Sequence, residues 1–343
     1  MAKQVALIKG DGVGPELVEA VQIVFDSVKP KINFVECDAG YEWWQTHGGE
    51  SFIPNETWEK LKGVDVCLKA PLTTPSISGA PRSVVVSIRQ KFDLYANVRP
   101  IKTFKGFEGP LGEVNFVCVR ETTEGLYSGL EHKIGDDAAI AIRKITRKQS
   151  EKVSRKAFEL AEERGWTKIV VVTKRNIMRE CDGIFMESVD KISKSFRGIE
   201  FEEYYIDNMS QQLVKNPQRF NQNIILGSNL FMDIISEEAS GLVGSIGCIY
   251  SANFGDRYAL FEPAHGSAPK YKGLYKVNPT AMILSAAWML MYLGEMAPGK
   301  AIFDATEEVI AEKKNVTYDL GGNASTLGVA KAIAEKAMNH IKQ

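Results

Sequence analysis

The chain has 343 residues, 44% of them hydrophobic, and a formal net charge of −1 at pH 7. This length suffices for one large or two modest domains, each with a buried core. The near-neutral net charge gives no indication of the strongly basic face that is typical of nucleic-acid-binding proteins, so we expect no nucleic-acid partner.

Membrane insertion is not expected either. The longest uncharged run, 279–294, is too short to span a bilayer and predicts a buried helix. The chain starts with a strand-like run at 5–8 rather than with a signal peptide. The cysteines show no CxxC spacing, and most lie in apolar runs, as reduced core thiols do. We therefore expect a cytoplasmic protein. The cysteines are Cys37, Cys67, Cys118, Cys181 and Cys248.

Strand-like runs alternate with amphipathic helices along the chain, which predicts an α/β fold. Apolar or β-branched runs predict strands at 5–8, 114–119, 169–172 and 224–226. Helical spacing predicts helices at 150–164, 229–238, 279–294 and 327–341. The segment 130–146 alternates and predicts a hairpin with its turn at Gly135-Asp136.

A glycine-rich loop, 10–14, follows the first predicted strand. It lacks the G-x-G-x-x-G spacing of a dinucleotide fingerprint, and no acidic residue follows at the distance that a ribose contact needs. The loop therefore predicts a strand-to-helix turn near a cofactor cleft rather than a direct phosphate cradle.

Asp233 and Glu237 lie one turn apart on one face of the predicted helix 229–238. Two carboxylates beside apolar neighbours repel each other and lose hydration, and a hard cation such as Mg²⁺ or Mn²⁺ removes both penalties. A solvated acidic helix face is the alternative for such a pair.

Arg89, Arg99 and Arg120 strengthen the metal interpretation. Arg120 ends a predicted buried strand, where a guanidinium is costly unless an anion meets it. Guanidinium groups bind carboxylates bidentately. Together with a metal-binding pair, these arginines favour a small polycarboxylate substrate chelated to a divalent ion. Structural salt bridges are the alternative for each arginine taken singly.

A series of motifs covers nearly the whole chain. They lie at 8–16, 69–75, 89–99, 120–129, 174–178, Asp207, 229–237 and 261–271. In this order they resemble the motifs of the β-decarboxylating dehydrogenases, the family of isocitrate, 3-isopropylmalate, homoisocitrate and tartrate/malate-type dehydrogenases.

The resemblance implies a two-domain α/β fold that is not a Rossmann fold. The large cofactor-binding domain is discontinuous, 1–99 plus 250–343, and the small domain for dimerisation and substrate binding is 100–249. The region at about 130–146 corresponds to an intersubunit arm or clasp. The implied assembly is a homodimer with shared active sites, to which Lys174 and Asp207 come from the partner subunit.

The resemblance also implies the chemistry, which is metal-dependent oxidative decarboxylation of a 2-hydroxy acid. Lys174 matches the lysine on the base side and Tyr127 the tyrosine of reprotonation. Ser83, Arg89, Arg99 and Arg120 match substrate-binding positions. Asp207, Asp233 and Glu237 match the ligands of Mg²⁺ or Mn²⁺.

For the cofactor, the loop 264–269 resembles the adenosine loop of the family. Lys270 and Tyr271 follow it where NAD-linked members commonly have Asp, a pattern that favours NADP, with NAD as the alternative. Gly322 stands where NADP enzymes often supply Arg. The cofactor-binding positions are Thr74, Glu262, His265, Gly266, Ser267, Ala268, Lys270, Tyr271, Val277, Asn278 and Tyr318.

Several positions depart from the family pattern: Val85 replaces the usual Asn of isocitrate enzymes, Glu237 the usual Asp, Met232 a Gly and Thr122 an Asn. Ser83, Arg82 and the motif 69–75 favour isocitrate as the substrate, whereas Val85 and Val86 favour an alkyl group. The expected activity is isocitrate dehydrogenase. The alternatives are homoisocitrate or 3-isopropylmalate dehydrogenase, and a catalytically silent regulatory subunit.

Overall fold

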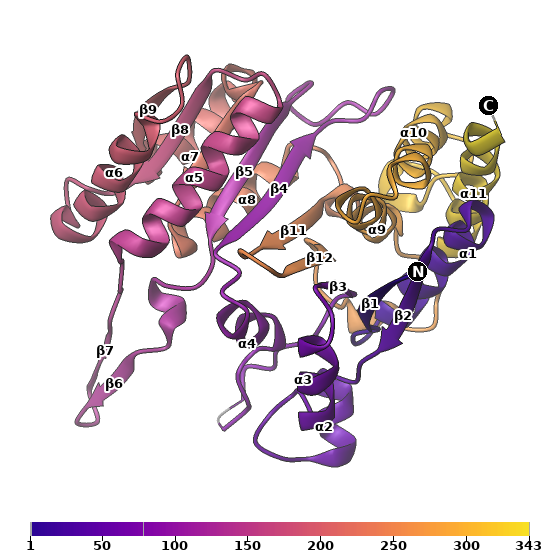
Figure 1. Ribbon diagram of the computed structural model, residues 1–343, viewed down its shortest axis with the longest axis horizontal. Helices are drawn as coiled ribbons and strands as arrows, with labels where there is room; N and C mark the ends of the chain where they lie inside the picture. Colours follow the sequence, from indigo (N-terminus) through magenta and orange to yellow (C-terminus); the bar gives the residue numbers. More distant parts are fainter. Residues whose placement is uncertain (1, 78, 343) are drawn as a thin grey trace.

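A single ten-stranded sheet runs through the protein, with helices on both of its faces (Figure 1). The computed structural model describes residues 2–77 and 79–342. In spatial order the strands are β2 (Ile32–Glu36), β1 (Lys3–Ile8), β3 (Val66–Lys69), β12 (Ala259–Pro263), β11 (Tyr250–Phe254), β4 (Ala96–Lys102), β5 (Asn115–Glu121), β10 (Asn223–Gly227), β8 (Lys168–Thr173) and β9 (Glu200–Tyr205).

The sheet consists of two parallel halves joined by antiparallel strands. Strands β2, β1, β3 and β12 pair in parallel, as do β5, β10, β8 and β9. Between the halves, β11 pairs antiparallel with β12 and β4, and β4 pairs antiparallel with β5. The first half thus takes strands from both ends of the chain. The predicted α/β class is confirmed, with a topology that differs from a Rossmann fold.

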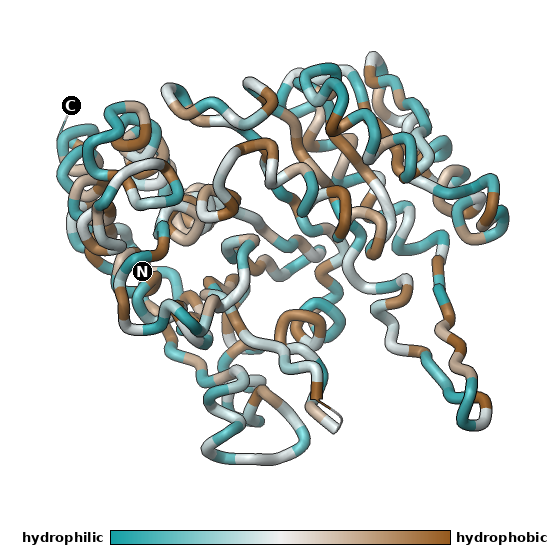
Figure 2. Tube along the Cα trace, turned by 180° about the vertical axis from the view of Figure 1, so that it is seen from behind, coloured by the Kyte–Doolittle hydropathy of each residue, from teal (hydrophilic) through white to brown (hydrophobic). Residues whose placement is uncertain are grey.

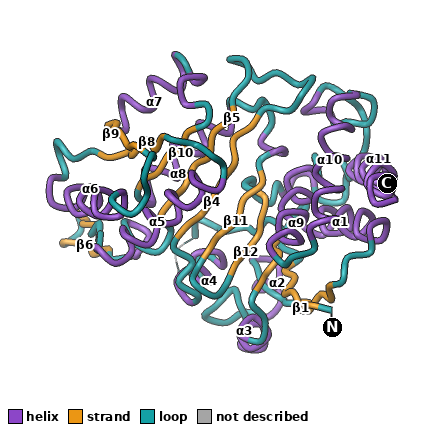
Figure 3. Tube along the Cα trace, turned by 45° about the horizontal axis from the view of Figure 1, so that its top comes forward, coloured by secondary structure: helices purple, strands orange, loops and turns teal. Residues whose placement is uncertain are grey.

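Helices from both halves cover each face of the sheet, and the central strands β4, β11 and β12 run between α5 and α9 in Figure 3. One face carries α1 (Gly14–Val28), α9 (Thr280–Tyr292), α10 (Met296–Glu312) and α11 (Thr326–Lys342) beside α5 (Arg147–Glu163) and α6 (Arg179–Ser193). The other carries α2 (Tyr41–His47), α3 (Asn55–Lys62) and α4 (Val84–Lys91) beside α7 (Ile206–Lys215) and α8 (Asn229–Gly241).

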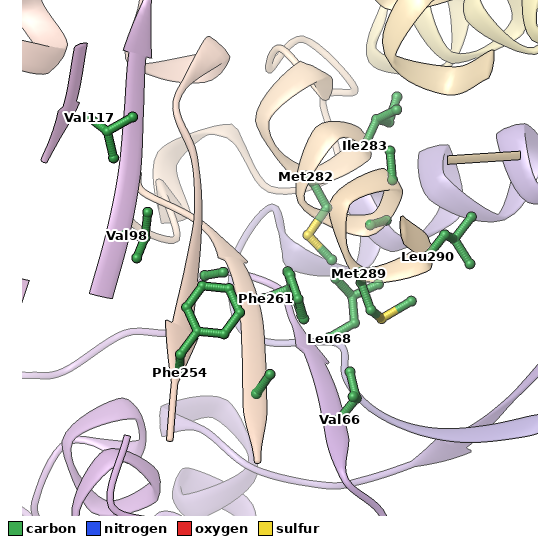
Figure 4. Close-up of a cluster of buried hydrophobic side chains, with 14 of the residues drawn as sticks. Val66, Leu68, Val98, Val117, Phe254, Phe261, Met282, Ile283, Met289 and Leu290 are labelled. Carbon is green, nitrogen blue, oxygen red and sulfur yellow. The ribbon is translucent and has the colours of Figure 1, made fainter. Parts of the chain in front are cut away.

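The largest core lies between the sheet and the layer of helices that contains α5 and α9. Phe254 and Phe261 project from β11 and β12 toward Met282 and Met289 of α9 (Figure 4). Helix α9 has apolar residues on all its sides and is buried along nearly its whole length, as its uncharged sequence predicts. This packing holds the central strands between the two helix layers.

The hairpin predicted at 130–146 is present as β6 (Glu131–Ile134) and β7 (Ala138–Ala141). It projects from the body of the protein and carries several apolar residues along its length (Figure 2). A two-stranded hairpin on its own is at best marginally stable in water. The large apolar residues exposed on and beside it are Leu130, Ile134, Ile140 and Ile142.

Short 3-10 helices complete the fold: η1 (Leu126–Ser128), η2 (Pro217–Phe220), η3 (Ile246–Cys248), η4 (Pro269–Tyr271) and η5 (Tyr318–Leu320). All five cysteines are free thiols, and all but Cys181 are buried. Within 2–77 and 79–342, no helix has both the length and the apolar character needed to cross a bilayer.

Candidate active site

A cavity of about 410 Å³ opens where the two halves of the sheet meet, on the face that carries α4 and α8. Its walls come from segments that are far apart in the sequence, including the ends of β3 and β5 and the helices α4 and α8. Of the residues predicted from sequence, the following line it: Thr74, Ser83, Arg89, Arg99, Arg120, Tyr127, Asp233, Glu237, Glu262, His265 and Gly266.

The three predicted arginines converge on this cavity from α4, β4 and β5, and each is only 3–7% exposed. Each guanidinium is matched by a carboxylate and an amide oxygen. Arg89 bonds Asn253 and Glu262 at 2.8 and 3.2 Å. Arg99 bonds Asn97 and Glu237 at 3.0 and 2.6 Å. These contacts offset the cost of burying the charges.

Arg120 is the most buried of the three. Its Nε donates to Asn229 Oδ1 at 2.9 Å, and its Nη1 contacts the Asp233 carboxylate. Burial, followed by repulsion from Arg89, lowers the pKa of Arg120 to about 10. The guanidinium therefore remains charged at neutral pH, and its desolvation makes an incoming carboxylate a favourable partner.

Beneath the arginines, Glu262 joins two cations from neighbouring elements. Its carboxylate lies 2.9 Å from Lys69 Nζ and 3.2 Å from Arg89 Nη2. Burial opposes its ionisation, but Lys69 and Arg89 outweigh this and lower the pKa of Glu262 to about 2. The cavity therefore contains four basic side chains against three carboxylates, a surplus that suits an anionic ligand.

Asn97 and Asn253 connect these ion pairs, and sequence reasoning missed both. Asn97 Nδ2 donates to Asn253 Oδ1 at 3.1 Å, which also accepts from Arg89 Nε. Asn253 Nδ2 in turn donates to Glu262 at 2.8 Å. The available signal was strand alternation, because Asn97 lies two residues before Arg99 and shares its face of the sheet.

Helix α8 presents Asp233 and Glu237 on one face, as predicted. Asp233 contacts Arg120 and accepts a hydrogen bond from the Tyr127 hydroxyl, while Glu237 contacts Arg99. Burial, and then the bond to Asp233, raise the pKa of Tyr127, so the phenol stays protonated and can donate. A carboxylate and a proton donor thus meet at one wall of the cavity.

Lys174 and Asp207 form a separate pair outside this cavity. Lys174 Nζ lies 2.7 Å from Asp207 Oδ1, between the end of β8 and the start of α7. The bond to Lys174 lowers the pKa of Asp207. Within the described part of one chain, no cluster of three or more His, Cys, Asp or Glu side chains is arranged to hold a metal. Asp233 and Glu237 are therefore not joined by Asp207 within a single subunit.

A second cavity of about 400 Å³ adjoins the first through His265 and Gly266. Tyr271 and Tyr318 stack at one side of it, with ring centroids 6.3 Å apart and planes inclined by 14°. Such a wall suits a flat aromatic group. The predicted residues that line this cavity are His265, Gly266, Ala268, Tyr271, Val277, Asn278 and Tyr318.

Asp319 and the segment 245–247 also line this cavity, and sequence reasoning missed them. The Asp319 carboxylate accepts from Ser245 and, at 2.9 Å, from Asn278 Nδ2. Its second oxygen, Oδ1, and His265 Nε2 are buried without a partner among the described residues. Unpaired buried polar atoms facing a cavity are suited to a polar ligand. The sequence did offer a signal for Asp319, because it directly follows Tyr318, a predicted cofactor-binding residue.

Ser267 and Lys270 do not line either cavity. Ser267 instead fixes the loop 264–269: its carbonyl accepts from Val13 N at 2.9 Å, and a Cβ at Gly12 would approach that carbonyl oxygen to 2.1 Å. The glycine-rich loop thus packs against the loop 264–269 and then turns into α1, as predicted. Position 12 must be glycine, because any side chain there would collide with the Ser267 carbonyl oxygen.

Two further positions carry finer predictions. At Gly322, a Cβ would lie 2.1 Å from the carbonyl oxygen of Val316, so the backbone leaves no room for a side chain at this position. Arg82 donates to the carbonyl oxygen of Tyr127 and to Gln90 Oε1, both at 2.7 Å. It is therefore engaged with the Tyr127 loop and does not line the cavity, whereas Ser83, Val85 and Val86 do.

The fold and the site together define a class of enzyme. An arginine-rich, carboxylate-bearing cavity that adjoins an aromatic-walled cavity suits a small polyanion and a nucleotide cofactor, the combination that decarboxylating hydroxy-acid dehydrogenases need. The model of the isocitrate/isopropylmalate dehydrogenase family matches residues 4–336, and the chain belongs to this family.

Named relatives cover nearly the whole chain. The alpha subunit of human mitochondrial NAD isocitrate dehydrogenase is 38% identical over 333 residues, 97% of this chain and 90% of that protein. The 3-isopropylmalate/3-methylmalate dehydrogenase of Methanocaldococcus jannaschii is 39% identical over 337 residues, 97% and 98% of the two chains. The crystal structure of isocitrate dehydrogenase from Methylococcus capsulatus superposes with a TM-score of 0.93 at 39% identity, covering 98% and 99%.

Proposed function

We propose that this enzyme oxidatively decarboxylates isocitrate to 2-oxoglutarate and CO₂, with NADP as its preferred cofactor. The observation that carries the proposal is the convergence of Arg89, Arg99 and Arg120 on one cavity that also contains Asp233 and Tyr127. Isocitrate has three carboxylates and a 2-hydroxyl group, which match an anion-binding floor with a proton donor beside it. The likeness to isocitrate dehydrogenases supports this choice.

The donor chemistry of the cavity fits a divalent metal. Asp233 and Glu237 provide hard carboxylate oxygens one helical turn apart, 32% and 44% exposed at their side chains. Mg²⁺ commonly uses one or two protein carboxylates together with substrate oxygens and water. When bound, the metal supplies charge stabilisation at the oxygens of the reacting 2-hydroxy acid. Asp207 of a partner subunit would complete the carboxylate set.

Metal binding also frees the arginines. In the described chain, Asp233 and Glu237 pair with Arg120 and Arg99. If Asp233 and Glu237 held a cation, Arg120 and Arg99 would lose their counter-charges, and the carboxylates of the substrate would replace them. We therefore propose that metal and substrate bind cooperatively.

Tyr127 and Lys174 are the proposed proton-transfer groups. The Tyr127 hydroxyl, protonated and directed at Asp233, donates the proton that the carbon atom takes up after CO₂ leaves. Lys174 is proposed to act from the partner subunit, where it removes the hydroxyl proton. The side chains of Lys174 and Asp207 are 24% and 68% exposed, and the pair lies outside the cavity, where a neighbouring chain could meet it.

A homodimer is therefore part of the proposal. The projecting hairpin β6–β7 is the proposed arm, because Leu130, Ile134 and Ile140 are exposed to solvent in the single chain. The proposed domain limits are 1–99 plus 250–343 and 100–249, with the active-site cavity between the two domains. A reducing compartment such as the cytoplasm suits the free thiols.

Substrate choice depends on the rim of the cavity. Ser83 offers a hydroxyl to the third carboxylate of isocitrate. Val85 and Val86 line the same rim and favour 3-isopropylmalate as the second candidate, which the M. jannaschii relative also supports. Homoisocitrate, with one more methylene, is the third. A catalytically silent subunit is disfavoured, because the cavity retains its arginines, Asp233 and Tyr127.

NADP is preferred over NAD in this proposal by a modest factor. Tyr271 lines the second cavity, and Lys270, which precedes it and does not line the cavity, is exposed. An ammonium and a phenol placed in this way can hold a 2′-phosphate that extends out of the cavity. The human relative is named as an NAD enzyme, which makes NAD the alternative.

Initial rates with isocitrate, homoisocitrate and 3-isopropylmalate, each with NAD and NADP, test the proposal. We expect the highest kcat/KM for isocitrate with NADP. Val85→Asn should raise the rate with isocitrate and lower any rate with 3-isopropylmalate, while Val214→Asn, at an exposed position of α7 outside the cavity, serves as the control. A wild-type preference for either other acid would replace the substrate while leaving the mechanism unchanged.

A further inference from the structure

A third, smaller cavity of about 220 Å³ lies apart from the active site, and the proposed reaction does not use it. Three aromatic rings form much of its wall. Tyr250 meets Trp288 edge to face, with centroids 5.7 Å apart and planes at 85°, and meets Phe303 at 5.4 Å and 73°. Met291 completes the apolar lining. Rings set at such angles leave a space that suits one more flat apolar group.

The charged side chains at this cavity are all basic. Arg164 and Lys300 line it and are exposed, and none of its described lining residues is acidic. The nearby Glu307 is already engaged, with its carboxylate 2.6 Å from Lys102 Nζ. Arg164 lies over the ring of Trp166 at 5.1 Å, which orients its guanidinium.

Tyr250 adds a hydrogen-bond donor to this apolar wall. Burial raises the pKa of Tyr250 to about 12, with Arg164 acting in the opposite direction. The phenol therefore stays protonated across the physiological range and can donate to an acceptor in the cavity. Two cations and a neutral donor around an aromatic box are complementary to an anion that carries a flat apolar body.

The cavity lies directly behind the active site, on the opposite face of the same strands. Pro100 of β4 lines it, while the adjacent Arg99 lines the active-site cavity. Tyr250 of β11 lines it, while the adjacent Ser251 lines the active-site cavity. Successive side chains of a strand point to opposite faces, so two central strands form a wall of both cavities.

The cavity also joins the two halves of the sheet. Arg164 follows the last residue of α5, which packs on the β5–β10 half. Trp288 of α9 and Lys300 of α10 belong to the helix layer over the β11–β12 half. The two helix layers lie on the same side of the sheet, as Figure 3 shows. A ligand that contacts both cations would therefore bridge the two halves.

We propose that this rear cavity is a second ligand site, which binds a small aromatic carboxylate between Arg164 and Lys300 with its ring against Trp288. The carboxylate pairs with the two cations and accepts from the Tyr250 hydroxyl, and the ring fills the space beside Phe303. Because the ligand draws the two halves together on one face of the shared strands, it separates them on the other. Bound ligand should therefore raise the KM for the acid substrate.

Phenylacetate and its neutral counterpart phenylacetamide provide matched probes. Binding to the full-length wild-type protein is measured by titration calorimetry, with and without saturating isocitrate and Mg²⁺, in the absence of NADP so that no turnover occurs. We expect saturable binding of phenylacetate, at least about tenfold tighter than that of phenylacetamide, because two charge-assisted contacts are lost with the amide. Saturating substrate should weaken phenylacetate binding without abolishing it.

The double variant Arg164→Gln/Lys300→Gln tests the assignment within the protein. Both side chains are exposed, so the fold should persist, and basal kcat and KM should stay unchanged. The control Arg155→Gln/Lys331→Gln removes the same charge from exposed positions elsewhere. Phenylacetate affinity should fall about tenfold or more in the first variant only. Equal affinity for the two probes, equal loss in both variants, or complete displacement by substrate would each overturn the rear site.

Discussion

Asn97 and Asn253 face each other in register on β4 and β11, and a hydrogen bond of 3.1 Å joins their side chains. Both are completely buried. Through them the guanidinium of Arg99 is connected with that of Arg89, two proposed substrate contacts from different elements. The pair thus links the two halves of the sheet at the floor of the active-site cavity.

We therefore expect Asn97→Ala to raise the KM for the acid substrate more than it lowers kcat. The change removes the acceptor of Arg99 Nε and one of the donors to Asn253 Oδ1. Leaving such buried groups unpaired costs about 1–3 kcal/mol of free energy. Steady-state kinetics measure the effect, and thermal unfolding measures the stability. Asn223→Ala is the matched control, because Asn223 is a buried strand asparagine outside the cavity. If both variants lose stability and neither changes KM, the pair has no role in orienting the arginines.

Activity should depend completely on a divalent metal. Chelation with EDTA is expected to abolish turnover, and Mg²⁺ or Mn²⁺ to restore it. Asp233→Asn should lose more activity than Glu237→Gln, because Asp233 also accepts from Tyr127 whereas Glu237 contacts only the Arg99 side of the cavity. Full activity in excess EDTA would remove the metal from the proposal, and the reverse order of the two variants would reassign the principal ligand.

Tyr127→Phe and Lys174→Met should fail at different steps. Without its hydroxyl, Tyr127→Phe should retain reduction of the 2-oxo intermediate better than complete oxidative decarboxylation. Lys174→Met should lose both. Separate assays of the two half-reactions measure the difference.

Mixing the two variants tests whether the site is shared. If Lys174 acts from the partner, a mixed dimer contains one site with both groups intact, and part of the activity should return. Lys174→Met mixed with a second Lys174→Met preparation, differently tagged, is the control for subunit exchange. Verified mixed dimers without recovered activity would confine the site to one subunit.

Substitution of Lys270 should change the preference for NADP over NAD, whereas substitution of Gly322 should not. Lys270→Asp replaces a cation by an anion beside the proposed 2′-phosphate and should shift kcat/KM toward NAD. Gly322→Arg should destabilise the protein without strengthening the NADP preference, because its Cβ would meet the Val316 carbonyl oxygen. Rates with both cofactors and thermal unfolding measure these outcomes. A stable Gly322→Arg variant with tighter NADP binding would contradict the geometry.

Acid stability should depend on Glu262. Its pKa falls from an ordinary 4.5 to about 2 in the fold. A depressed pKa stabilises the folded state above the ordinary value, and this stabilisation is lost as the pH falls toward 2. Glu262→Gln should therefore lower stability near neutral pH and flatten its decline below about pH 4.5. Chemical unfolding across this range measures the slope. Glu36→Gln is the control, since Glu36 is exposed.

The sequence alone determined the α/β class, the hairpin, the buried helix α9 and the helix that carries Asp233 and Glu237. Each follows from local periodicity, which depends on whether a side chain faces the core or water. The resemblance of the motifs to a known family also identified most of the residues that line the two cavities of the site. For the arginines and for Asp233 and Glu237, burial of charge was an independent physical signal.

Only the tertiary structure decided which of these residues meet. Asn97 and Asn253 are 156 positions apart and come together because β4 and β11 pair antiparallel in a particular register. Asp207 lies with Lys174 rather than with Asp233 in the single chain, and Arg82 turns to the Tyr127 carbonyl. The physical reason is that strand pairing and side-chain direction are set by the packing of the whole sheet, which no local pattern encodes.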